Sequence, residues 1–237
     1  MIRRMYGSML VIKLDKVTST QDFAEAVNDM LYEDFLVIAE EQTKARGRFG
    51  RSWYSPRGGL WFTYVKKNFK TEDVQLSGAK VALAIMEILK SYVDAKIRWP
   101  NDIVVNDKKI AGILIEAKTR ENINYSDLFI GVGIDVNVKS FPPDIVATSL
   151  YLELGKEIII DINNIINKIE QYLRMDNESS INLLNQNLSI KDKEVLLIGS
   201  NWEKKCKALF VDFMGRLVTE CGIYEVEEIY RVELVKE

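Results

Sequence analysis

Hydrophobic and polar residues alternate in two different periods along the first part of the chain. Short apolar runs and period-two alternation predict three strands, over residues 9–17, 35–41 and 60–66. Apolar residues at helical spacing predict a helix capped by Ser19 or Thr20 and a long amphipathic helix over 74–92. The predicted order is therefore strand, helix, strand, loop, strand, helix.

The middle and end of the chain contain further strand patterns with one helical region between them. Four consecutive strands are predicted over residues 96–99, 103–105, 109–117 and 128–138. Because no helical segment separates these strands, they indicate an antiparallel or mixed sheet. Helical spacing returns over 161–188, and short strands separated by glycines occupy 195–233. We expect an α+β fold with two domains, 1–188 and 189–237, the second a small β-barrel.

Composition narrows the class of protein. The 237 residues are 47% hydrophobic and 28% charged, as in a globular chain, and no apolar run approaches the roughly 20 residues that span a bilayer. The first residues lack the apolar stretch of a signal peptide, so we expect a cytoplasmic protein without a membrane partner. Cys206 and Cys221 lie in strand-like apolar sequence and are predicted to be buried free thiols. The absence of histidine excludes a histidine-dependent triad and a histidine metal site.

One short segment is strongly basic although the whole chain has a net charge of −3. It reads Lys44-Ala45-Arg46-Gly47-Arg48-Phe49-Gly50-Arg51-Ser52-Trp53. Guanidinium groups offer forked donors to phosphate or carboxylate, glycine allows close backbone approach, and tryptophan stacks on flat rings. The segment therefore predicts a site for a phosphate and a base, with a solvated surface loop as the alternative. It lacks the spacing of a P-loop, and the net charge argues against a general nucleic-acid binder.

Three other segments carry candidate chemistry. In Arg98-Trp99-Pro100-Asn101-Asp102 and the strand that starts at Lys109, a lysine at the mouth of the core is placed to meet an anion. Asp102 has three open roles: to orient that lysine, to accept a proton or to help hold a metal ion. Gly131-Val132-Gly133-Ile134-Asp135 fits a buried strand with small residues and does not match a dinucleotide-binding turn. Thr18-Ser19-Thr20-Gln21-Asp22 is an N-cap segment whose hydroxyls also suit a polar ligand.

Together these segments resemble the biotin protein ligases in chain order over nearly the whole length. The matching positions are Ser19 to Gln21, Gln42, Arg46 to Trp53, Trp99 to Asp102, Lys109 to Glu116, and Ala147 to Leu150. Three residues depart from the family pattern. Ala45 stands at a usual glycine, Arg98 at a usual lysine, and Asp135 at a usual asparagine.

The resemblance implies a mixed-sheet catalytic domain over 1–188, flanked by helices, and an SH3-like domain over 189–237. It also implies a two-step reaction with ATP, Mg²⁺ and biotin. The biotin carboxylate attacks the α-phosphate of ATP to give biotinyl-5′-adenylate and pyrophosphate. A lysine of a biotin carboxyl carrier protein then takes the biotinyl group as an amide.

The resemblance also implies a role for each matching residue. Catalytic roles fall to Arg48, Arg51, Lys109 and Asp102. Biotin would be bound by Ser19, Thr20, Gln21, Gln42, Arg46, Gly47, Arg48, Lys109, Gly112 and Leu114. ATP would be bound by Arg48, Arg51, Trp53, Asn101, Lys109 and Asp135. The metal ligands stay open, with Mg²⁺ expected on the phosphates of ATP.

Three other functions share part of this sequence pattern. A lipoate–protein ligase shares the architecture, but the arginine-rich loop and Trp99 to Asp102 favour biotin. A biotin-responsive repressor would need a DNA-binding domain, for which too few residues precede Ser19. We therefore expect a monofunctional ligase without a DNA partner, and a homodimer by resemblance. A nucleotide-binding module without catalysis is disfavoured by the presence of Arg48 and Lys109.

Overall fold

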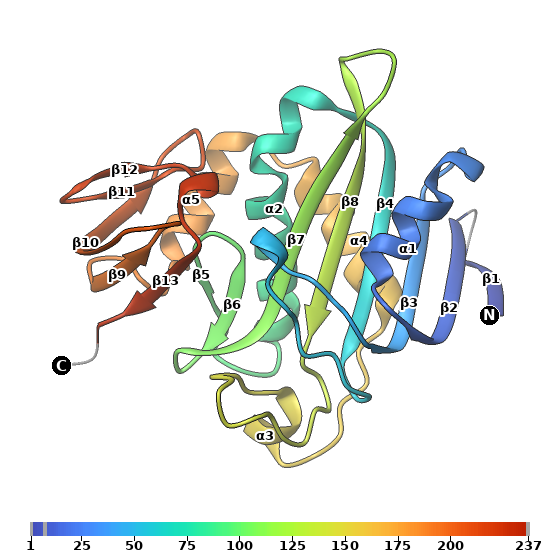
Figure 1. Cartoon of the computed structure of the whole chain (residues 1–237), viewed down its shortest axis with the longest axis horizontal. Helices are drawn as coiled ribbons and strands as arrows, with labels where there is room; N and C mark the ends of the chain where they lie inside the picture. Colours follow the sequence, from blue (N-terminus) through green and yellow to red (C-terminus); the bar gives the residue numbers. More distant parts are fainter. Residues whose placement is uncertain (1, 7–8, 236–237) are drawn as a thin grey trace. The chain divides into compact units, whose positions relative to one another are not determined.

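The computed structural model describes residues 2–6 and 9–235 (Figure 1). By internal packing the chain divides into two units. The first comprises the residues up to Val74 together with Ile110–Asp161, and the second comprises Gln75–Lys109 and the residues from Ile162 onward. Each unit contains its own strands and helices.

The first unit is built on a mixed sheet. Its strands follow the order β1-β2-β3-β4-β8-β7. Their bounds are Ile2–Tyr6, Met9–Val17, Phe35–Gln42, Leu60–Lys70, Tyr125–Ile134 and Lys108–Thr119, respectively. The β2–β3 pair is parallel and the other neighbours are antiparallel, which confirms the predicted mixed sheet. A parallel pair needs a crossover, and the helix predicted between β2 and β3 supplies it.

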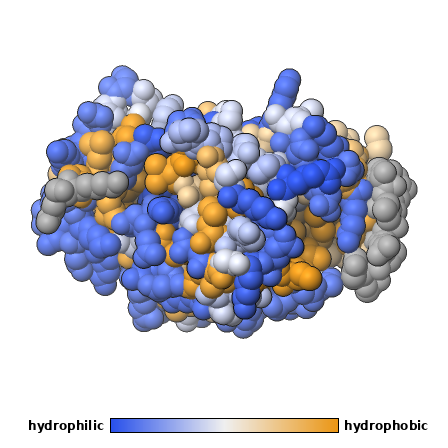
Figure 2. All heavy atoms as spheres, turned by 90° about the horizontal axis from the view of Figure 1, so that it is seen from below, coloured by the Kyte–Doolittle hydropathy of each residue, from blue (hydrophilic) through white to orange (hydrophobic). Residues whose placement is uncertain are grey.

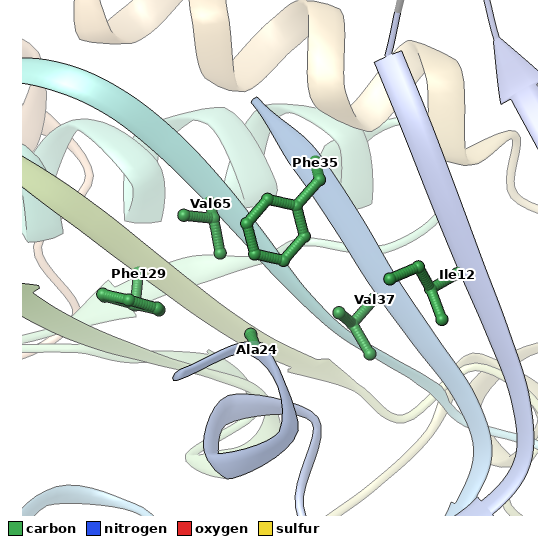
Figure 3. Close-up of a cluster of buried hydrophobic side chains, with 6 residues drawn as sticks. All are labelled: Ile12, Ala24, Phe35, Val37, Val65 and Phe129. Atoms are coloured by element: carbon green, nitrogen blue, oxygen red, sulfur yellow. The ribbon is translucent and has the colours of Figure 1, made fainter. Parts of the chain in front are cut away.

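That crossover helix, α1 (Thr20–Val27), packs on one face of the sheet (Figure 3). Ser19 is its N-cap and accepts a hydrogen bond from the Asp22 backbone N–H at 3.3 Å. The buried side of the helix packs against strand residues whose side chains point toward the same face of the sheet. The core cluster consists of Ile12, Ala24, Phe35, Val37, Val65 and Phe129. Burial of this apolar face fixes the helix on the sheet and so fixes where its N-terminus lies.

The second unit contains a hairpin, helices and a second sheet. The hairpin pairs β5 (Lys96–Arg98) with β6 (Asp102–Val105) in antiparallel fashion. The helices are α2 (Val74–Lys90), α4 (Ile162–Leu173) and α5 (Asn177–Gln186). The backbone of Ile97 in β5 donates to Asn187 O and accepts from Ser189 N–H, which ties the hairpin to the segment after α5.

The end of the chain forms an antiparallel sheet in the order β12-β11-β10-β9-β13. The bounds are Gly222–Tyr224, Leu217–Thr219, Glu203–Val211, Glu194–Ile198 and Arg231–Leu234, respectively. Five short antiparallel strands at the C-terminus fit an SH3-like domain, as the sequence predicted. The described fold is therefore α+β.

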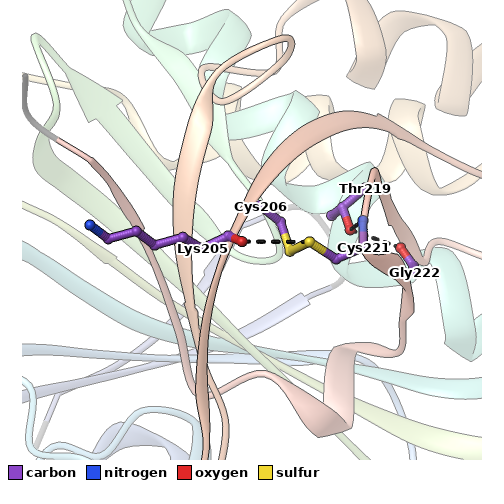
Figure 4. Close-up of a disulfide and its surroundings, with 5 residues drawn as sticks. All are labelled: Lys205, Cys206, Thr219, Cys221 and Gly222. Carbon is purple, nitrogen blue, oxygen red and sulfur yellow. Dashed lines mark hydrogen bonds between the residues drawn. A yellow bond between two sulfur atoms is a disulfide. The ribbon is translucent and has the colours of Figure 1, made fainter.

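The prediction of free thiols is wrong, because Cys206 and Cys221 form a disulfide (Figure 4). Cys206 lies on β10, and Cys221 lies in the turn between β11 and β12. Antiparallel pairing of β10 with β11 returns the chain until the two Cα atoms are 5.9 Å apart, a distance that suits a disulfide. The spacing of the two cysteines in the sequence does not reveal that they lie side by side. Their proximity depends on the register of the β10–β11 pairing.

Several predicted boundaries also differ from the structure. The strand expected to run to Val138 ends at Ile134. The helix expected over 161–188 is split into α4 and α5, with Asp176 as the N-cap of α5 and a hydrogen bond from Ser179 N–H to its carboxylate at 2.8 Å. Strand β1 and the short helix α3 (Leu150–Leu154) were not predicted. Helical periodicity continues across the α4–α5 break, so only the N-cap marks it.

The surface shown in Figure 2 is largely hydrophilic, with hydrophobic atoms visible between the charged side chains. Within residues 2–6 and 9–235, none of the helices has the length and apolar character needed to cross a bilayer.

Candidate active site

A polar network surrounds the first turn of α1 in the first unit. Gln42 Oε1 accepts from the Thr20 backbone N–H at 2.8 Å and from the Thr20 hydroxyl at 3.1 Å. Gln42 Nε2 donates to Ser55 Oγ at 3.1 Å. The hydroxyl of Thr63 lies 3.0 Å from Thr20 Oγ1 and 3.1 Å from Gln21 Oε1. The network holds Thr20 and Gln42, two predicted biotin ligands, in one fixed arrangement.

An ion cluster adjoins this network and is centred on Arg46. The Arg46 guanidinium contacts Asp22 at 2.7 Å, Glu25 at 3.2 Å and Glu116 at 2.5 Å. Glu116 also accepts from Gln21 Nε2 at 2.8 Å, so the cluster and the network are continuous. Arg46 and Gln21 are both predicted to bind biotin. In the structure, the Arg46 side chain contacts Asp22, Glu25 and Glu116, and the Gln21 amide donates to Glu116.

The charges of this cluster shift its pKa values in opposite directions. Hydrogen bonds from its donors to Glu116 raise the pKa of Arg46 further above its ordinary value. Burial and the negative charge of Glu116 raise the pKa of Glu25. Burial also acts to raise the pKa of Glu116, but hydrogen bonds from Arg46 and Gln21 outweigh it and lower that pKa. Three carboxylates around one guanidinium make the cluster negative overall.

A stripe of glycines lies on the α1 side of the sheet beside the network. Gly131 pairs with Leu114 and Thr63, and Gly133 pairs with Gly112. A Cβ atom on Gly131 would lie 2.6 Å from Gln21 Oε1. The missing side chains therefore let other groups lie flat against the sheet. Gly112 and Leu114 are half-buried here, as a predicted biotin slot requires.

Trp53 uses the same stripe. A Cβ atom on Gly133 would lie 2.7 Å from Trp53 Nε1, and the Trp53 ring meets Trp61 edge to face at a centroid distance of 6.5 Å. The sequence interpretation of this segment as a buried strand with small residues for close packing is confirmed from Gly131 to Ile134, whereas Asp135 lies beyond the end of β8. The packing partners, which the sequence did not identify, are Gln21 and Trp53.

The basic segment forms a small hairpin rather than an irregular loop. Trp53 N–H donates to Ala45 O at 2.9 Å, and Gly47 N–H donates to Arg51 O at 2.7 Å. The turn contains Phe49 at φ 57° and Gly50 at φ 69°, both in the left-handed region. The Arg48 guanidinium lies over the Phe49 ring, with Cζ 4.9 Å from its centroid. The two arginines of this hairpin have different surroundings: Arg46 is half-buried and Arg51 is exposed.

A second group of candidate residues lies in the second unit. Asp102, at the start of β6, meets Lys109 Nζ at 2.5 Å and Arg98 Nη2 at 3.0 Å. The side chains of Asp102 and Lys109 are 17% and 20% exposed. Burial acts to raise the pKa of Asp102, but Lys109 and Arg98 lower it below its usual value. Asn101, also half-buried, lies in the turn just before Asp102.

The departure at Asp135 lies in a tightly bonded part of the first unit. Asp135 is 2% exposed, its backbone N–H donates to Ile110 O, and its backbone O accepts from Leu150 N–H. Asn137, two residues on, exchanges two side-chain hydrogen bonds with the backbone of Ile158, at 2.8 and 2.9 Å. These two hydrogen bonds of the Asn137 amide hold the loop at Ile158.

Sequence reasoning missed several members of the polar network. Thr63 lies between apolar residues of a predicted strand, and Glu116 ends a motif that was read for its lysine and glycine. Asp22 was noted only as part of the N-cap segment, and Glu25 was not singled out. The one available signal was their spacing, since positions 22 and 25 share a helix face. Among the described residues, no cluster of three or more metal-binding acidic or cysteine side chains is present.

Comparison with known proteins decides the family. The model of the biotin/lipoate A/B protein ligase family matches residues 11–135, more than half of the chain. The chain belongs to this family. The matched region contains the polar network, the basic hairpin, the glycine stripe and the Asp102–Lys109 pair.

Similar members of the family are named as ligases. A bifunctional ligase/repressor of Bacillus spizizenii is 36% identical over 158 residues, which are 62% of this chain and 48% of that protein. A biotin–[acetyl-CoA-carboxylase] ligase of Paracoccus denitrificans is 33% identical over 114 residues, 45% of each chain. The chain spans about half the length of these curated relatives that it matches.

A solved structure extends the likeness beyond the matched region. The biotin protein ligase of Aquifex aeolicus, solved in complex with biotin and ATP, is 25% identical with a TM-score of 0.79. The match covers 95% of this chain and 99% of that one. This chain therefore shares the α+β fold of that biotin protein ligase over nearly its whole length.

Proposed function

We propose that this chain ligates biotin to a lysine of a biotin carboxyl carrier protein in an ATP-dependent reaction. The observation that carries the proposal is the Thr20–Gln42–Thr63 network beside a glycine-lined, half-buried stretch of sheet. Such a place offers fixed polar anchors next to an apolar slot, which suits a small bicyclic amide with an alkyl carboxylate tail. The named activities of the relatives support the same reaction.

We propose that the polar network binds the biotin ring and that the glycine-lined slot buries its apolar surface. Thr20 and Gln42 are proposed to bind the ureido group, and Ser19, buried and capping α1, fixes their position. Gly112 and Leu114 are proposed to contact the rings and the alkyl chain. Gln21, Arg46 and Gly47 are proposed to shape the pocket around biotin, with Gln21 and Arg46 held by Glu116.

The first chemical step brings two anions together, so positive charge must be placed in advance. The biotin carboxylate oxygen bonds to the α-phosphorus, and the bond from that phosphorus to pyrophosphate breaks. Arg48 and Lys109 are proposed to neutralise the carboxylate and α-phosphate, and Arg51, exposed on the hairpin, the leaving pyrophosphate. Trp53, Asn101 and Asp135 are proposed to bind the nucleotide.

In the second step the acceptor lysine attacks the acyl carbon, AMP leaves, and the amine loses its proton. Asp102 is a weak base because Lys109 and Arg98 lower its pKa. We therefore assign it the orientation of Lys109, not proton abstraction; the sequence had left both roles open. The same cations would stabilise the charge that develops on the carbonyl oxygen and on the departing phosphate.

Magnesium is proposed to arrive with the phosphates of ATP. The described residues do not fit a protein-held site, because the Asp102 carboxylate already faces Lys109 and Arg98, and no cluster of three ligands is found among them. A homodimer, a cytoplasmic location and the absence of a DNA partner stay predictions, which light scattering, fractionation and a DNA-shift assay would test.

The decisive experiment is mass spectrometry after incubation with Mg·ATP and an equal mixture of biotin and lipoate. We expect biotinyl-adenylate, and biotinylated carrier domain when that acceptor is added. Lys109→Met should abolish the adenylate, whereas Lys108→Met, at the exposed neighbouring position, should retain it. Lipoyl-adenylate in place of biotinyl-adenylate would give the lipoate ligase assignment, and binding of ATP without any adenylate would give the non-catalytic module.

A further inference from the structure

A turn of the C-terminal sheet holds one side chain of the Arg98 to Asp102 segment. The turn joins β10 to β11 and runs from Asp212 to Arg216. The indole Nε1 of Trp99 donates to Gly215 O at 2.9 Å. Trp99 is only 3% exposed, so this bond is formed away from water and is costly to leave unmade.

The turn is rigid, because its own side chains hold it. The Asp212 carboxylate accepts from the backbone N–H groups of Met214 and Arg216 at 2.9 and 3.0 Å, and from Arg216 Nε at 2.8 Å. Gly215 has φ +82°, which favours glycine, and a Cβ there would lie 3.0 Å from Leu76 Cδ2. The Gly215 carbonyl is therefore presented to Trp99 in one fixed direction.

A second bond joins the same turn to the start of α2. Gln75 Nε2 donates to Met214 O at 2.9 Å. Consecutive carbonyls of the turn thus accept from Gln75 and Trp99, while the Phe213 side chain remains 71% exposed. The backbone of the turn makes these two contacts, and the exposed Phe213 ring is free to vary without touching them.

Trp99 is the first residue of the three-residue turn between β5 and β6, and Asp102 directly follows this turn as the first residue of β6. Arg98, directly before Trp99, pairs with Asp102 in the β5–β6 register and contacts its carboxylate. Displacement of the Trp99 ring would therefore shift both the backbone that carries Asp102 and the guanidinium that holds it. Lys109 Nζ, 2.5 Å from Asp102, would lose its fixed partner.

We propose that Trp99 is a positioning residue, locked by the Gly215 carbonyl, which sets the geometry of the Asp102–Lys109 pair. The C-terminal sheet thereby acts on the reaction without contacting a reacting atom. The inference rests on the proposed function for its catalytic consequence, but the geometric link itself does not. A displacement of about 1 Å in a positioned group can lower a rate by about a hundredfold.

The test compares Trp99→Phe, which keeps a ring but removes the donor, with Phe213→Ala, which alters the exposed ring of the same turn. For Trp99→Phe we expect a fall of roughly tenfold in kcat for adenylate formation, with KM for biotin within about twofold of wild type. Phe213→Ala should match wild type in both. Gly215→Ala alters the residue whose carbonyl accepts the Trp99 hydrogen bond, and it should reproduce the Trp99→Phe effect.

A double variant separates positioning from general loss of structure. If Trp99 acts through Asp102, the combined Trp99→Phe and Asp102→Asn variant should be no slower than Asp102→Asn alone. Independent effects that multiply would overturn the proposal, as would a kcat within twofold of wild type in folded Trp99→Phe. Thermal unfolding of each variant shows whether the protein compared is folded.

A readout that needs no enzymatic activity keeps the two proposals distinguishable. Brief acetylation with acetic anhydride, followed by peptide mass spectrometry, gives the reactivity of Lys109 relative to exposed Lys108. We expect this ratio to rise roughly threefold in Trp99→Phe and to stay at the wild-type value in Phe213→Ala. An unchanged ratio in folded Trp99→Phe overturns the positioning role. Failure of the wild type to form biotinyl-adenylate overturns the proposed function instead, and the labelling still decides the link.

Discussion

Two ion clusters beside α1 use similar side chains but differ in burial and in balance of charge. At the first turns of the helix, Arg46 meets Asp22, Glu25 and Glu116, whose side chains are 34–48% exposed. Just past the last residue of α1, the Lys67 ammonium lies 3.1 Å from the Asp127 carboxylate, and both side chains are 4% exposed or less. The first has an excess of negative charge and the second an excess of positive charge.

Hydrogen bonds from neighbouring groups hold the second cluster together. Lys67 Nζ donates to Asn28 O at 2.8 Å and to Asn28 Oδ1 at 2.5 Å. Arg120 binds Asp127 through two hydrogen bonds, at 2.6 and 3.0 Å. The pair lies at an irregularity in the β4–β8 register, between Lys66 and Phe69. A buried pair that is fully bonded mainly fixes the fold, whereas a half-exposed cluster with unbalanced charge stays responsive to pH and ligand.

The sharpest test of this difference removes the buried cation. Lys67→Met should lower the free energy of unfolding by about 3 kcal/mol, because it leaves a buried carboxylate and the Asn28 acceptors without their donor. Urea denaturation at pH 7 measures the change. Lys118→Met is the matched control, since that lysine binds Asp29 on the surface and should hardly alter stability. If both variants lowered the free energy of unfolding equally, the buried pair would contribute no more to stability than the surface pair.

Acid should weaken the buried cluster over a defined range. Burial acts to raise the pKa of Asp127, but hydrogen bonds from Arg120, Asn28 and Lys67 outweigh it and lower the pKa to about 2 from 3.8. A lowered carboxylate pKa stabilises the fold above the unfolded pKa, and this stability is lost as pH falls from about 4 to about 2. We expect a loss of about 2 kcal/mol that Asp127→Asn does not show, measured by urea denaturation at stepwise pH.

Removal of the cation from the exposed cluster should have a smaller effect. Arg46→Met leaves Asp22, Glu25 and Glu116 close together, which should cost about 1 kcal/mol at pH 7. The cost should shrink below pH 4 as these carboxylates bind protons. Urea denaturation at pH 7 and pH 3.5 gives both values. A cost that is independent of pH would show that packing of the arginine stem, not charge, is what the variant lost.

The smallest effect is expected from a change that relieves the charge excess. Burial and Glu116 raise the pKa of Glu25, so the folded protein holds a proton there more tightly than the unfolded chain does. Stability due to this group is therefore lost as pH rises above about 4.5. Glu25→Gln should raise stability at pH 7 by roughly 0.5 kcal/mol, a low figure because the side chain is 43% exposed. Destabilisation at pH 7 would show instead that the Glu25–Arg46 contact is a net attraction.

Local patterns predicted much of the fold because they depend on neighbouring residues. Strand β2 has the predicted bounds, and Ser19, one of two proposed caps, is the N-cap of α1. The break at Asp176 was missed, since apolar spacing continues across it. The disulfide between Cys206 and Cys221 was missed because it depends on strand register, which no local pattern reveals.

The sequence by itself determined the residue types of the site: the basic hairpin, the small residues of β8, and the Lys109 and Asp102 motifs. Only the tertiary structure decided which of them meet. Thr20 and Gln42, 22 positions apart, are brought together because β2 and β3 are parallel and α1 begins at their shared end. Arg46 and Glu116, 70 positions apart, meet through the order of the sheet. Long-range pairing depends on burial and register across the whole fold, so no short stretch of sequence contains it.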